Sequence, residues 1–354
     1  MSDNLSLLIT GGAGFIGTHA AHRFARRGFR VTVLDNLSRP GAELNLAWLR
    51  QECAAIEFTR CDVRDRDGIE AIFRGRRFSA VLHLAAQVAV TTSLAAPWED
   101  FQTNAAGTLH VLEAVRRYCP ESVFIFASTN KVYGELAGFE SVRHGNRWSF
   151  RDRQGVDEST ALDFHSPYGC SKGAADQYVI DYARIYGLRS AAFRQSCIYG
   201  ERQFGVEDQG WVAWFAIAAV LGRPLTIYGD GAQVRDLLHV DDLLDAYELG
   251  IEHPEAIAGQ AFNLGGGPAN TLSLLELIEL LESSLERRIS PRFESWRPGD
   301  QKVFVSDIGK VSRRLGWTPR IGCREGVQRL LAWVRANREL LQRHLDRGSG
   351  LSPR

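Results

Sequence analysis

The chain has no net charge, because its 42 basic and 42 acidic side chains cancel. Such a balance gives no general electrostatic attraction for nucleic acid or acidic lipid, and we expect neither as a partner. No apolar run reaches the roughly 18 residues that a membrane span requires, and the first four residues lack the basic stretch of a secretory signal. The sequence therefore predicts a cytoplasmic protein.

Cysteine and lysine are both scarce. The six cysteines lie far apart and form neither a C-x-x-C pair nor a Cys/His cluster with zinc spacing, so we expect reduced thiols and no metal site. Only four of the 42 basic residues are lysines, which leaves 42 − 4 = 38 arginines. Each lysine that remains is therefore of interest, and two of them, Lys131 and Lys172, fall inside the motifs described below.

Short apolar runs alternate with longer amphipathic segments in the first half of the chain. The runs predict strands at residues 5–10, 30–34, 56–60, 80–84 and 123–127, with helical patterns between them, as at 18–27, 68–73 and 104–118. Strands that alternate with helices are typical of a parallel sheet. The predicted fold class is therefore α/β, with a Rossmann-type doubly wound parallel sheet.

After about residue 196 the pattern is less regular. Helical stretches at 211–221, 272–288 and 324–344 alternate with Gly/Pro turns, which predicts a smaller C-terminal α/β domain. We expect residues 1–196, with a returning segment at about 236–263, to form the first domain, and residues 197–235 and 264–345 the second. Residues 136–156 predict an inserted loop, and residues 346–354 a flexible tail.

A glycine-rich turn follows the first predicted strand and precedes a predicted helix. Its sequence G-G-A-G-F-I-G (11–17) fits both G-x-x-G-x-x-G and G-x-G-x-x-G. In this setting such a turn binds the pyrophosphate of a dinucleotide, because glycine lets the backbone approach the phosphates closely and the helix N-terminus attracts negative charge. Taken alone, the glycine pattern is also consistent with a plain turn.

Asp35 follows the second predicted strand, 18 residues after the last glycine of the turn. A carboxylate there can accept hydrogen bonds from both hydroxyls of an adenosine ribose and would repel a 2′-phosphate, which favours NAD over NADP. The nearby Arg39 weakens this preference, and a plain turn before Asn36 is the alternative. Asp62 and Val63, after the third strand, are candidates to flank the adenine, although Asp is also common at strand ends.

Tyr168 and Lys172 open a long helical pattern that ends near Gly187. Ser166 suits the N-cap and Pro167 the first helical position. Residues four apart share one face of a helix. A neighbouring ammonium and a cationic nicotinamide both favour a phenolate and so lower the pKa of a tyrosine from its usual value of about 10. The pattern Y-x-x-x-K is common by itself and gains its weight from the dinucleotide turn upstream.

Thr129 lies at the end of the fifth predicted strand, in S-T-N-K-V-Y-G (128–134). Sites of open α/β sheets form at the carboxyl ends of strands, so its hydroxyl is placed to bond a substrate hydroxyl that is being oxidised. A hydroxyl that caps the turn is the alternative.

Together these motifs resemble the extended short-chain dehydrogenase/reductases of the nucleotide-sugar epimerase/dehydratase group. They are T-G-G-A-G-F-I-G (10–17), D-N-L-S-R (35–39), H-L-A-A-Q (83–87), S-T-N-K-V-Y-G (128–134) and Y-G-C-S-K (168–172), in an order kept to about residue 335. Within the group, the stretches at 162–178, 202–204, 208–212 and 233–236, and the insertion at 136–156, are most similar to the CDP-tyvelose (CDP-paratose) 2-epimerases.

The resemblance implies NAD as the cofactor of the first domain and a nucleotide sugar as the substrate of the second. Thr129, Tyr168 and Lys172 would form the catalytic triad, Thr129 also binding substrate and the other two also contacting NAD. Besides Asp62 and Val63 above, the NAD-binding residues that it implies are Gly11, Gly14, Phe15, Ile16, Gly17, Asp35, Asn36, Ser38, Arg39, Leu84, Ala85, Ala86, Gln87 and Asn104.

On the substrate side, the resemblance assigns Arg235 and Arg297 to the diphosphate, whose oxygens match the fork of a guanidinium. Cys197 is expected to face the sugar and the nicotinamide. Cys197 departs from the pattern of the family, since many members carry Asn at this position. Gln195 departs from the pattern of the tyvelose subgroup, which has His there. A small buried residue is the alternative for Cys197, and His165 is a candidate for either substrate contact or a turn.

Asn130 and Lys131 stand where the dehydratases of the group carry Asp and Glu. Without a carboxylic acid, the loss of water has no proton donor, which favours an epimerase over a dehydratase. The alternatives are a turn former for Asn130 and a solvent-facing side chain for Lys131.

The predicted function is therefore that of an isomerase, an NAD-dependent nucleotide-sugar epimerase acting through a transient keto sugar. By resemblance the carbon is C2 of a CDP-hexose such as CDP-paratose or CDP-tyvelose. The main alternative is a UDP-sugar 4-epimerase. A net oxidoreductase is a third interpretation, and a non-catalytic NAD-sensing regulator is a remote one. Members of the group are usually homo-oligomers. Residues 178–186 offer aromatic side chains for a dimer or tetramer contact, which burial inside one subunit explains equally well.

Overall fold

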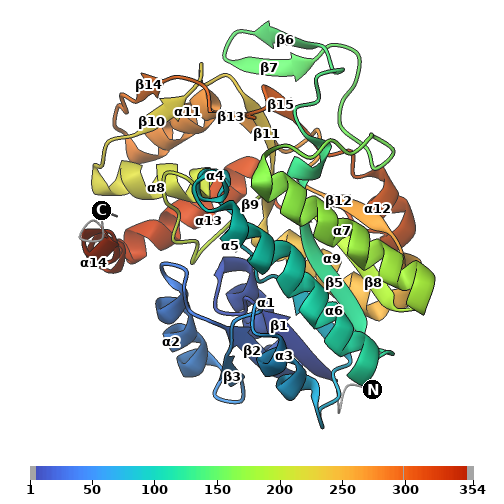
Figure 1. Cartoon of the computed structure of the whole chain (residues 1–354). Helices are drawn as coiled ribbons and strands as arrows, with labels where there is room; N and C mark the ends of the chain where they lie inside the picture. Colours follow the sequence, from blue (N-terminus) through green and yellow to red (C-terminus); the bar gives the residue numbers. More distant parts are fainter. Residues whose placement is uncertain (1–4, 298, 349–354) are drawn as a thin grey trace.

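Seven parallel strands form the central layer of the molecule, in the order β12-β8-β5-β4-β1-β2-β3 (Figure 1). The computed structural model describes residues 5–297 and 299–348. This arrangement confirms the predicted α/β fold with a doubly wound parallel sheet. The strands are β1 (Ser6–Thr10), β2 (Arg30–Asp35), β3 (Glu57–Arg60), β4 (Ala80–His83), β5 (Val123–Thr129), β8 (Arg189–Gln195) and β12 (Ala261–Leu264).

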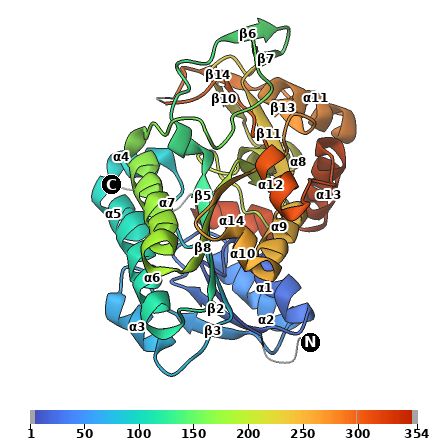
Figure 2. The same ribbon diagram turned by 90° about the vertical axis from the view of Figure 1, so that its right-hand side faces the viewer.

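Helices cover both faces of this sheet, because successive side chains of a buried strand point to opposite sides. In β1, Leu7 and Ile9 pack into one core and Leu8 into the other. Figure 2 shows the two helical layers on either side of the strands. One layer holds α1 (Phe15–Arg26), α2 (Ala42–Glu52), α9 (Val240–Glu252), α10 (Pro254–Ile257) and α12 (Gly309–Leu315), and the other α3 (Arg66–Phe73), α6 (Gly107–Tyr118) and α7 (Ser166–Tyr186).

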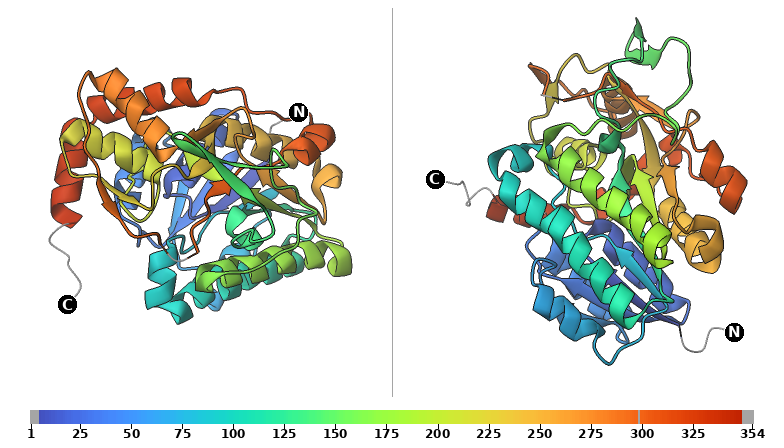
Figure 3. Two further views of the ribbon diagram at one scale, coloured as in Figure 1. Left: turned by 90° about the horizontal axis from the view of Figure 1, so that it is seen from above. Right: turned by 45° about the vertical axis from the view of Figure 1, so that its right-hand side comes forward.

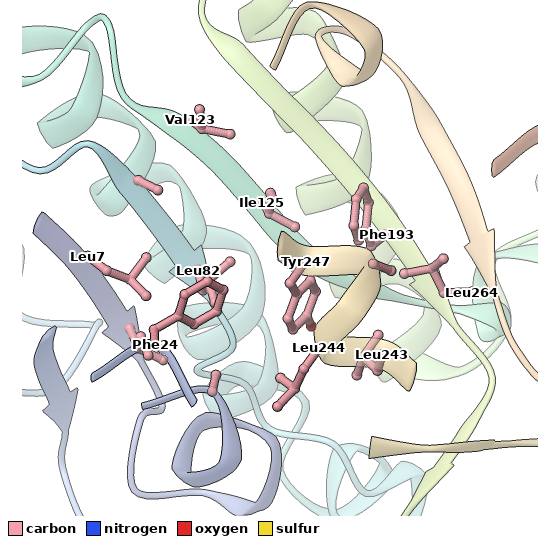
Figure 4. Packing of buried hydrophobic residues seen from close by; sticks show 14 of the residues in the cluster. Leu7, Phe24, Leu82, Val123, Ile125, Phe193, Leu243, Leu244, Tyr247 and Leu264 are labelled. Carbon is pink, nitrogen blue, oxygen red and sulfur yellow. The ribbon is translucent and has the colours of Figure 1, made fainter. Parts of the chain in front are cut away.

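The first of these cores joins segments that are far apart in the sequence. Phe24 of α1, Leu82 of β4 and Tyr247 of α9 meet there with Phe193 of β8 (Figure 4). Since α9 packs against α1 and β12 lies at one edge of the large sheet, the chain returns to this sheet and its helices after residue 239.

The second region contains short strands and helices with a core of their own (Figure 3). Its strand β10 pairs with β14, and β11 pairs with β9, β13 and β15. Their bounds are β9 (Cys197–Tyr199), β10 (Thr226–Tyr228), β11 (Val234–His239), β13 (Thr271–Ser273), β14 (Arg292–Glu294), β15 (Val303–Phe304), α8 (Trp211–Leu221), α11 (Leu274–Leu285), α13 (Cys323–Ala336) and α14 (Arg338–Gly348).

The predicted loop at residues 136–156 contains an antiparallel hairpin instead, β6 (Ser141–His144) and β7 (Arg147–Phe150). The strand β7 alternates polar and apolar side chains, and Gly145, with φ of 59°, makes the two-residue connection possible. In Figure 1 this hairpin stands out at the top of the molecule.

Three helix predictions also change. The pattern at 104–118 divides into a π-helical turn, η1 (Gln102–Ala106), and α6. The pattern at 324–344 divides into α13 and α14, which Asn337 separates with a non-helical backbone. The helix predicted from residue 272 begins later, at Leu274, because Ser273 and Glu276 form a capping box.

The predicted tail at residues 346–354 is wrong for its first part, since α14 continues to Gly348, and positions 349–354 lie outside the described residues. Within the described residues, no helix is both long and apolar enough to cross a membrane.

Candidate active site

A cavity of about 600 Å³ lies between the carboxyl ends of the large sheet and the second region. The strand order reverses between β1 and β4, which is the place where open α/β sheets bind ligands. The structure brings nearly all the predicted site residues to this cavity. Those that line it are Gly11, Gly14, Phe15, Ile16, Gly17, Asp35, Asn36, Ser38, Arg39, Asp62, Val63, Leu84, Ala85, Ala86, Thr129, Tyr168, Lys172, Cys197, Arg235 and Arg297.

The glycine turn leaves no room for side chains. A Cβ on Gly17 would lie 2.3 Å from the Gly11 carbonyl oxygen, and one on Gly11 would lie 2.7 Å from the Ala85 nitrogen. Gly14 begins α1 without a side-chain cap, and the first turn of the helix holds no acidic residue. The free N–H groups and the helix dipole thus suit a pyrophosphate, and the turn fits the predicted dinucleotide.

Asp35 ends β2 at the rim of the turn. Its Oδ2 accepts a hydrogen bond from the Ala13 N–H at 3.0 Å and its Oδ1 one from the Leu37 N–H at 2.8 Å. Burial raises the pKa of this carboxyl, while the backbone N–H groups lower it. Asp35 therefore also braces the glycine turn, a role that the sequence reading did not include.

Asp62 and Asn36 form the neighbouring wall. Asn36 Nδ2 donates to Asp62 Oδ2 at 2.8 Å, and Arg64 pairs with the same oxygen at 2.8 Å. The hydrogen bonds from Arg64 hold the Asp62 pKa down to about 2. Arg39 bonds Gln209 of the second region, so this loop also connects the two sides of the cavity.

Gln87 and Asn104 do not line the cavity. The Gln87 N–H donates to Asn104 Oδ1 at 2.9 Å, and Asn104 Nδ2 donates to the Gln87 carbonyl at 2.9 Å and to Ser171 Oγ at 3.1 Å. They tie the chain after β4 to helix α7, because the fully buried Asn104 must satisfy its polar atoms internally. Their contact with the cofactor stays a prediction.

Tyr168 and Lys172 both lie near the start of α7, and both are almost fully buried. The helix is bounded at Ser166, one residue earlier than predicted, but Ser166 has a φ of 63° and its Oγ accepts the Gly169 N–H at 3.2 Å, as an N-cap side chain does. Thr129, at the end of β5, opposes the rise in the Tyr168 pKa and caps the following 3-10 turn, η2 (Asn130–Tyr133), at the Lys131 N–H. The three predicted catalytic side chains thus all line the cavity.

The protein side chains by themselves do not produce the predicted low pKa of Tyr168. Burial raises the Tyr168 pKa to about 12, against a smaller opposing effect of Thr129. The Lys172 ammonium donates to the Ala127 carbonyl at 2.6 Å and lies 4.0 Å from the centre of the Phe126 ring. Burial lowers the Lys172 pKa to about 7, although Asp176 and Asp100 raise it.

A buried ion pair fixes α7 against the sheet. Arg194 Nη2 lies 2.8 Å from Asp176 Oδ1, and Ser128 Oγ donates to Asp176 Oδ2 at 2.6 Å. Since Asp176 is one turn beyond Lys172 and Ser128 precedes Thr129, this network sets the distance between the two catalytic elements. Nothing in the sequence pattern singled out these residues.

The two predicted diphosphate arginines lie on the second region's side of the cavity. Arg235 pairs with Asp300 at 2.6 Å and Arg297 with Asp208 at 2.9 Å. Cys197 accepts a weak hydrogen bond from Trp211 Nε1 at 3.4 Å, and burial raises the pKa of its thiol. Arg297 also lies 3.9 Å from the centre of the Tyr228 ring.

Several lining residues were missed. Tyr228 belongs to the short strand β10, where sequence patterns carry little information. Gln203 and Gln233 also line the cavity, and the Oε1 of each is buried without a hydrogen-bond partner among the described residues. Lys131 is not solvent-facing as one reading had it, since it lines the cavity and donates to the Gly299 carbonyl at 3.4 Å.

Fold and cavity together define a dinucleotide-binding α/β enzyme with a Tyr–Lys pair beside the cofactor site. A family model described as the NAD dependent epimerase/dehydratase family matches residues 7–265. The CDP-paratose 2-epimerase of Salmonella typhi is 46% identical over 338 residues, which are 93% of this chain and 99% of that protein.

Two solved structures extend the comparison. The UDP-glucose 4-epimerase of Thermotoga maritima with UDP-glucose is 31% identical with a TM-score of 0.80, and covers 94% of this chain and 99% of its own. The UDP-glucose 4-epimerase of Thermus thermophilus, complexed with NAD, is 31% identical with a TM-score of 0.76 and the same coverage. The chain belongs to the NAD-dependent epimerase/dehydratase family. NAD as the cofactor and an epimerase as the class of enzyme, both predicted from the sequence, are thereby confirmed.

Proposed function

We propose that the protein is a nucleotide-sugar epimerase that inverts C2 of a CDP-hexose, such as CDP-paratose or CDP-tyvelose, through a transient keto sugar. One observation carries the proposal. One cavity is lined both by Thr129, Tyr168 and Lys172 of the sheet side and by two arginines of the second region, Arg235 and Arg297. The 46% identity with a CDP-paratose 2-epimerase supports the nucleotide and the carbon.

The first domain, residues 1–196 with the returning segment 236–263, is proposed to hold NAD. The glycine turn would take the pyrophosphate, Asp35 the adenosine ribose, and Lys172 the nicotinamide ribose. When bound, NAD supplies a hydride acceptor that is restored within each turnover, together with the positive charge of its oxidised ring.

Tyr168 is the proposed base and acid. As a phenolate it would remove the proton of the C2 hydroxyl, and as a phenol return it to the keto oxygen. Because burial raises the Tyr168 pKa to about 12, the phenolate needs positive charge nearby. Lys172, one turn further along α7, and the oxidised ring of bound NAD would provide it. Thr129, whose hydroxyl opposes the rise in the Tyr168 pKa, would hold the same substrate oxygen.

The second domain, residues 197–235 and 264–345, is proposed to hold the nucleotide diphosphate. Arg235 and Arg297 would keep the diphosphate fixed while the keto sugar turns over and presents its other face. Asn130 and Lys131 offer no carboxylic acid for the loss of water, which supports epimerisation over dehydration.

A UDP-sugar 4-epimerase is the second candidate, favoured by the fold match to a 4-epimerase bound to UDP-glucose. Incubation of the purified protein with CDP- and UDP-hexoses, followed by mass spectrometry and NMR of the products, distinguishes the two. Inversion at C2 of a CDP-hexose is expected. Turnover of UDP-glucose without turnover of CDP-sugars would overturn the C2 assignment. Accumulation of NADH in step with product would identify a net oxidoreductase instead, and cofactor binding without turnover of any sugar an NAD-sensing regulator.

A homo-oligomer is also proposed, in the cytoplasm. Of the eight large apolar side chains that are exposed within the described parts of the chain, six lie on α4 (Val90–Ala95), α5 (Pro97–Phe101) and α7. These helices pack side by side over one face of the molecule (Figure 1). The six side chains are Leu94, Trp98, Phe101, Tyr178, Ile185 and Tyr186. An apolar surface of this kind marks a protein contact.

A further inference from the structure

Lys131 bonds both the catalytic Thr129 and the second region of the molecule. Its backbone N–H donates to Oγ1 of the catalytic Thr129 at 3.2 Å, so the start of its side chain is fixed beside the reacting group. Its Nζ reaches the second region and donates to the Gly299 carbonyl at 3.4 Å. Gly299 precedes Asp300, the partner of Arg235. All these residues line the same cavity.

The ammonium of Lys131 has capacity for a ligand. It carries three N–H donors, and the structure gives it one hydrogen bond within the described residues, which is long. Burial lowers the Lys131 pKa and Arg235 lowers it further, whereas Asp300 raises it. Binding of an anion stabilises a partly buried ammonium beside an arginine strongly. The anion offsets both the hydration that the ammonium has lost and its repulsion by the guanidinium.

The reacting carbon determines how far the diphosphate lies from Tyr168. In a hexose, C2 is bonded to C1, the carbon that carries the diphosphate, whereas C4 lies across the ring. When C2 stands at Tyr168 and Thr129, the sugar-linked phosphate must therefore lie close to them as well. An enzyme that acts at C2 therefore needs a cation for this phosphate no further from the catalytic threonine than the length of one side chain. In a 4-epimerase the width of the sugar ring separates the reacting carbon from the phosphate.

We propose that Lys131 binds the sugar-linked phosphate of the substrate and thereby selects C2 as the carbon that reaches Tyr168. This rests on the proposed function and deepens it. Lys131 is then a substrate-binding residue that determines specificity, and Arg235 and Arg297 hold the phosphate nearer the nucleoside. The position that supplies an acid in the dehydratases would here supply an anchor.

The test compares Lys131→Met and Lys131→Arg with Lys302→Met, a matched control at an exposed lysine that lies over Trp148. Binding of CDP and of CMP to the NAD-loaded protein is measured by calorimetry. Only CDP carries the second phosphate. We expect Lys131→Met to reduce the preference for CDP over CMP by about 10- to 100-fold, the size of a charge-assisted hydrogen bond, and Lys131→Arg to restore most of it. Lys302→Met should keep the preference.

A preference for CDP that stays within about threefold of the original in Lys131→Met would overturn the proposal, as would an equal loss of CMP and CDP affinity. This result is separable from the proposed function. If the product analysis shows C4 inversion of a UDP-sugar, the proposed function fails, and the same comparison with UDP and UMP still tests whether Lys131 binds the second phosphate. If Lys131→Met loses the preference for UDP over UMP and the protein inverts C4, Lys131 does bind the second phosphate. The selection of C2 by Lys131 is then refuted.

Discussion

Arg297 and Asp208 form an ion pair at the nucleotide end of the cavity, with Nη2 2.9 Å from Oδ1. The same guanidinium lies 3.9 Å from the centre of the Tyr228 ring, and Tyr228 in turn donates to Glu207. The second diphosphate arginine, Arg235, is likewise paired, with Asp300. Both arginines are thus neutralised by carboxylates of the protein, and a diphosphate that binds them must displace those carboxylates or share the guanidinium groups with them.

The substitution Asp208→Asn removes one of these competing carboxylates. We expect the affinity for CDP to rise about three- to tenfold, because a phosphate no longer competes with a carboxylate for Arg297. Calorimetric titration with CDP provides the measurement, and Asp152→Asn, at an exposed aspartate next to the hairpin, is the control. Weaker binding in Asp208→Asn would show that Asp208 supports the nucleotide site and does not compete with the ligand.

Replacing Tyr168 with Phe removes the proposed acid and base and keeps the ring. We expect kcat to fall by about 10²- to 10⁴-fold while NAD remains bound, since the phenol oxygen is needed for proton transfer and not for holding the dinucleotide. The control is Tyr178→Phe on the exposed face of the same helix. Steady-state kinetics and the NAD content of the purified protein measure the two effects. Turnover equal to that of the original protein would eliminate Tyr168 as the base.

His83 makes stability depend on pH. Its ring is fully buried, with Nδ1 2.7 Å from Thr10 Oγ1 and Nε2 3.0 Å from Thr108 Oγ1, and burial lowers its pKa from 6.5 to about 3. Between these two values the unfolded chain binds more protons than the folded one. The stability that a neutral His83 contributes is therefore complete above pH 6.5 and is lost progressively as the pH falls toward 3.

From pH 7 to pH 5 we expect the free energy of unfolding to fall by about 2 kcal/mol on account of His83. The variant His83→Gln should lack this part of the pH dependence, and His253→Gln, at an exposed histidine, should keep it. Urea denaturation at pH 5, 6 and 7 measures the difference. Identical pH profiles for the original protein and His83→Gln would contradict the prediction.

The tight packing of the glycine turn leads us to expect much weaker NAD binding in the variant Gly17→Ala. A Cβ there would lie 2.3 Å from the Gly11 carbonyl oxygen and 2.6 Å from the Gly12 Cα, both backbone atoms that cannot move without opening the turn. We expect the NAD affinity to fall by more than about 100-fold. Gly138→Ala, where a Cβ meets no atom within 4 Å, should bind NAD normally. Retention of NAD after gel filtration is the measurement, and normal retention in Gly17→Ala would place the pyrophosphate elsewhere.

Trp98→Glu tests the proposed oligomer. Trp98 is 67% exposed and stacks on Phe101, which is itself exposed, in α5. A charge at the centre of an apolar contact is costly to bury, so the variant should shift to monomers in analytical ultracentrifugation. Phe293→Glu, at an exposed apolar residue on β14, is the control and should not change the mass. If the original protein is itself a monomer at all concentrations, the proposal is wrong.

The sequence predicted the sheet and the cofactor turn well because both depend on local patterns. The five strands expected in the first half occur as β1 to β5, and the glycines, Asp35 and the Tyr–Lys pair are local motifs whose spacing fixes their place on a turn or on one face of a helix. The strands β8 and β12 were not predicted, since they lie among segments whose periodicity is broken by turns.

Where the sequence prediction was incomplete, the missing interaction is a tertiary contact. Gln87 and Asn104 were predicted beside the cofactor, and in the structure they bond each other, while Asn104 also bonds Ser171, because buried polar atoms must find partners within the protein. Lys172 and the nicotinamide were together expected to lower the Tyr168 pKa, and among the protein groups alone burial dominates the pKa of Tyr168 and of Lys172. Neither outcome follows from the spacing of residues along the chain.

By itself, then, the sequence determined the order of strands and helices in the first half, the glycine turn and the types of side chain at the catalytic positions, because turn geometry and helix periodicity act over a few residues. Only the tertiary structure decided that Lys131 spans from Thr129 to Gly299, and that Asp208 and Asp300 neutralise the arginines opposite. These contacts join residues far apart in the chain, and their distances depend on how the second region packs over the carboxyl ends of the sheet.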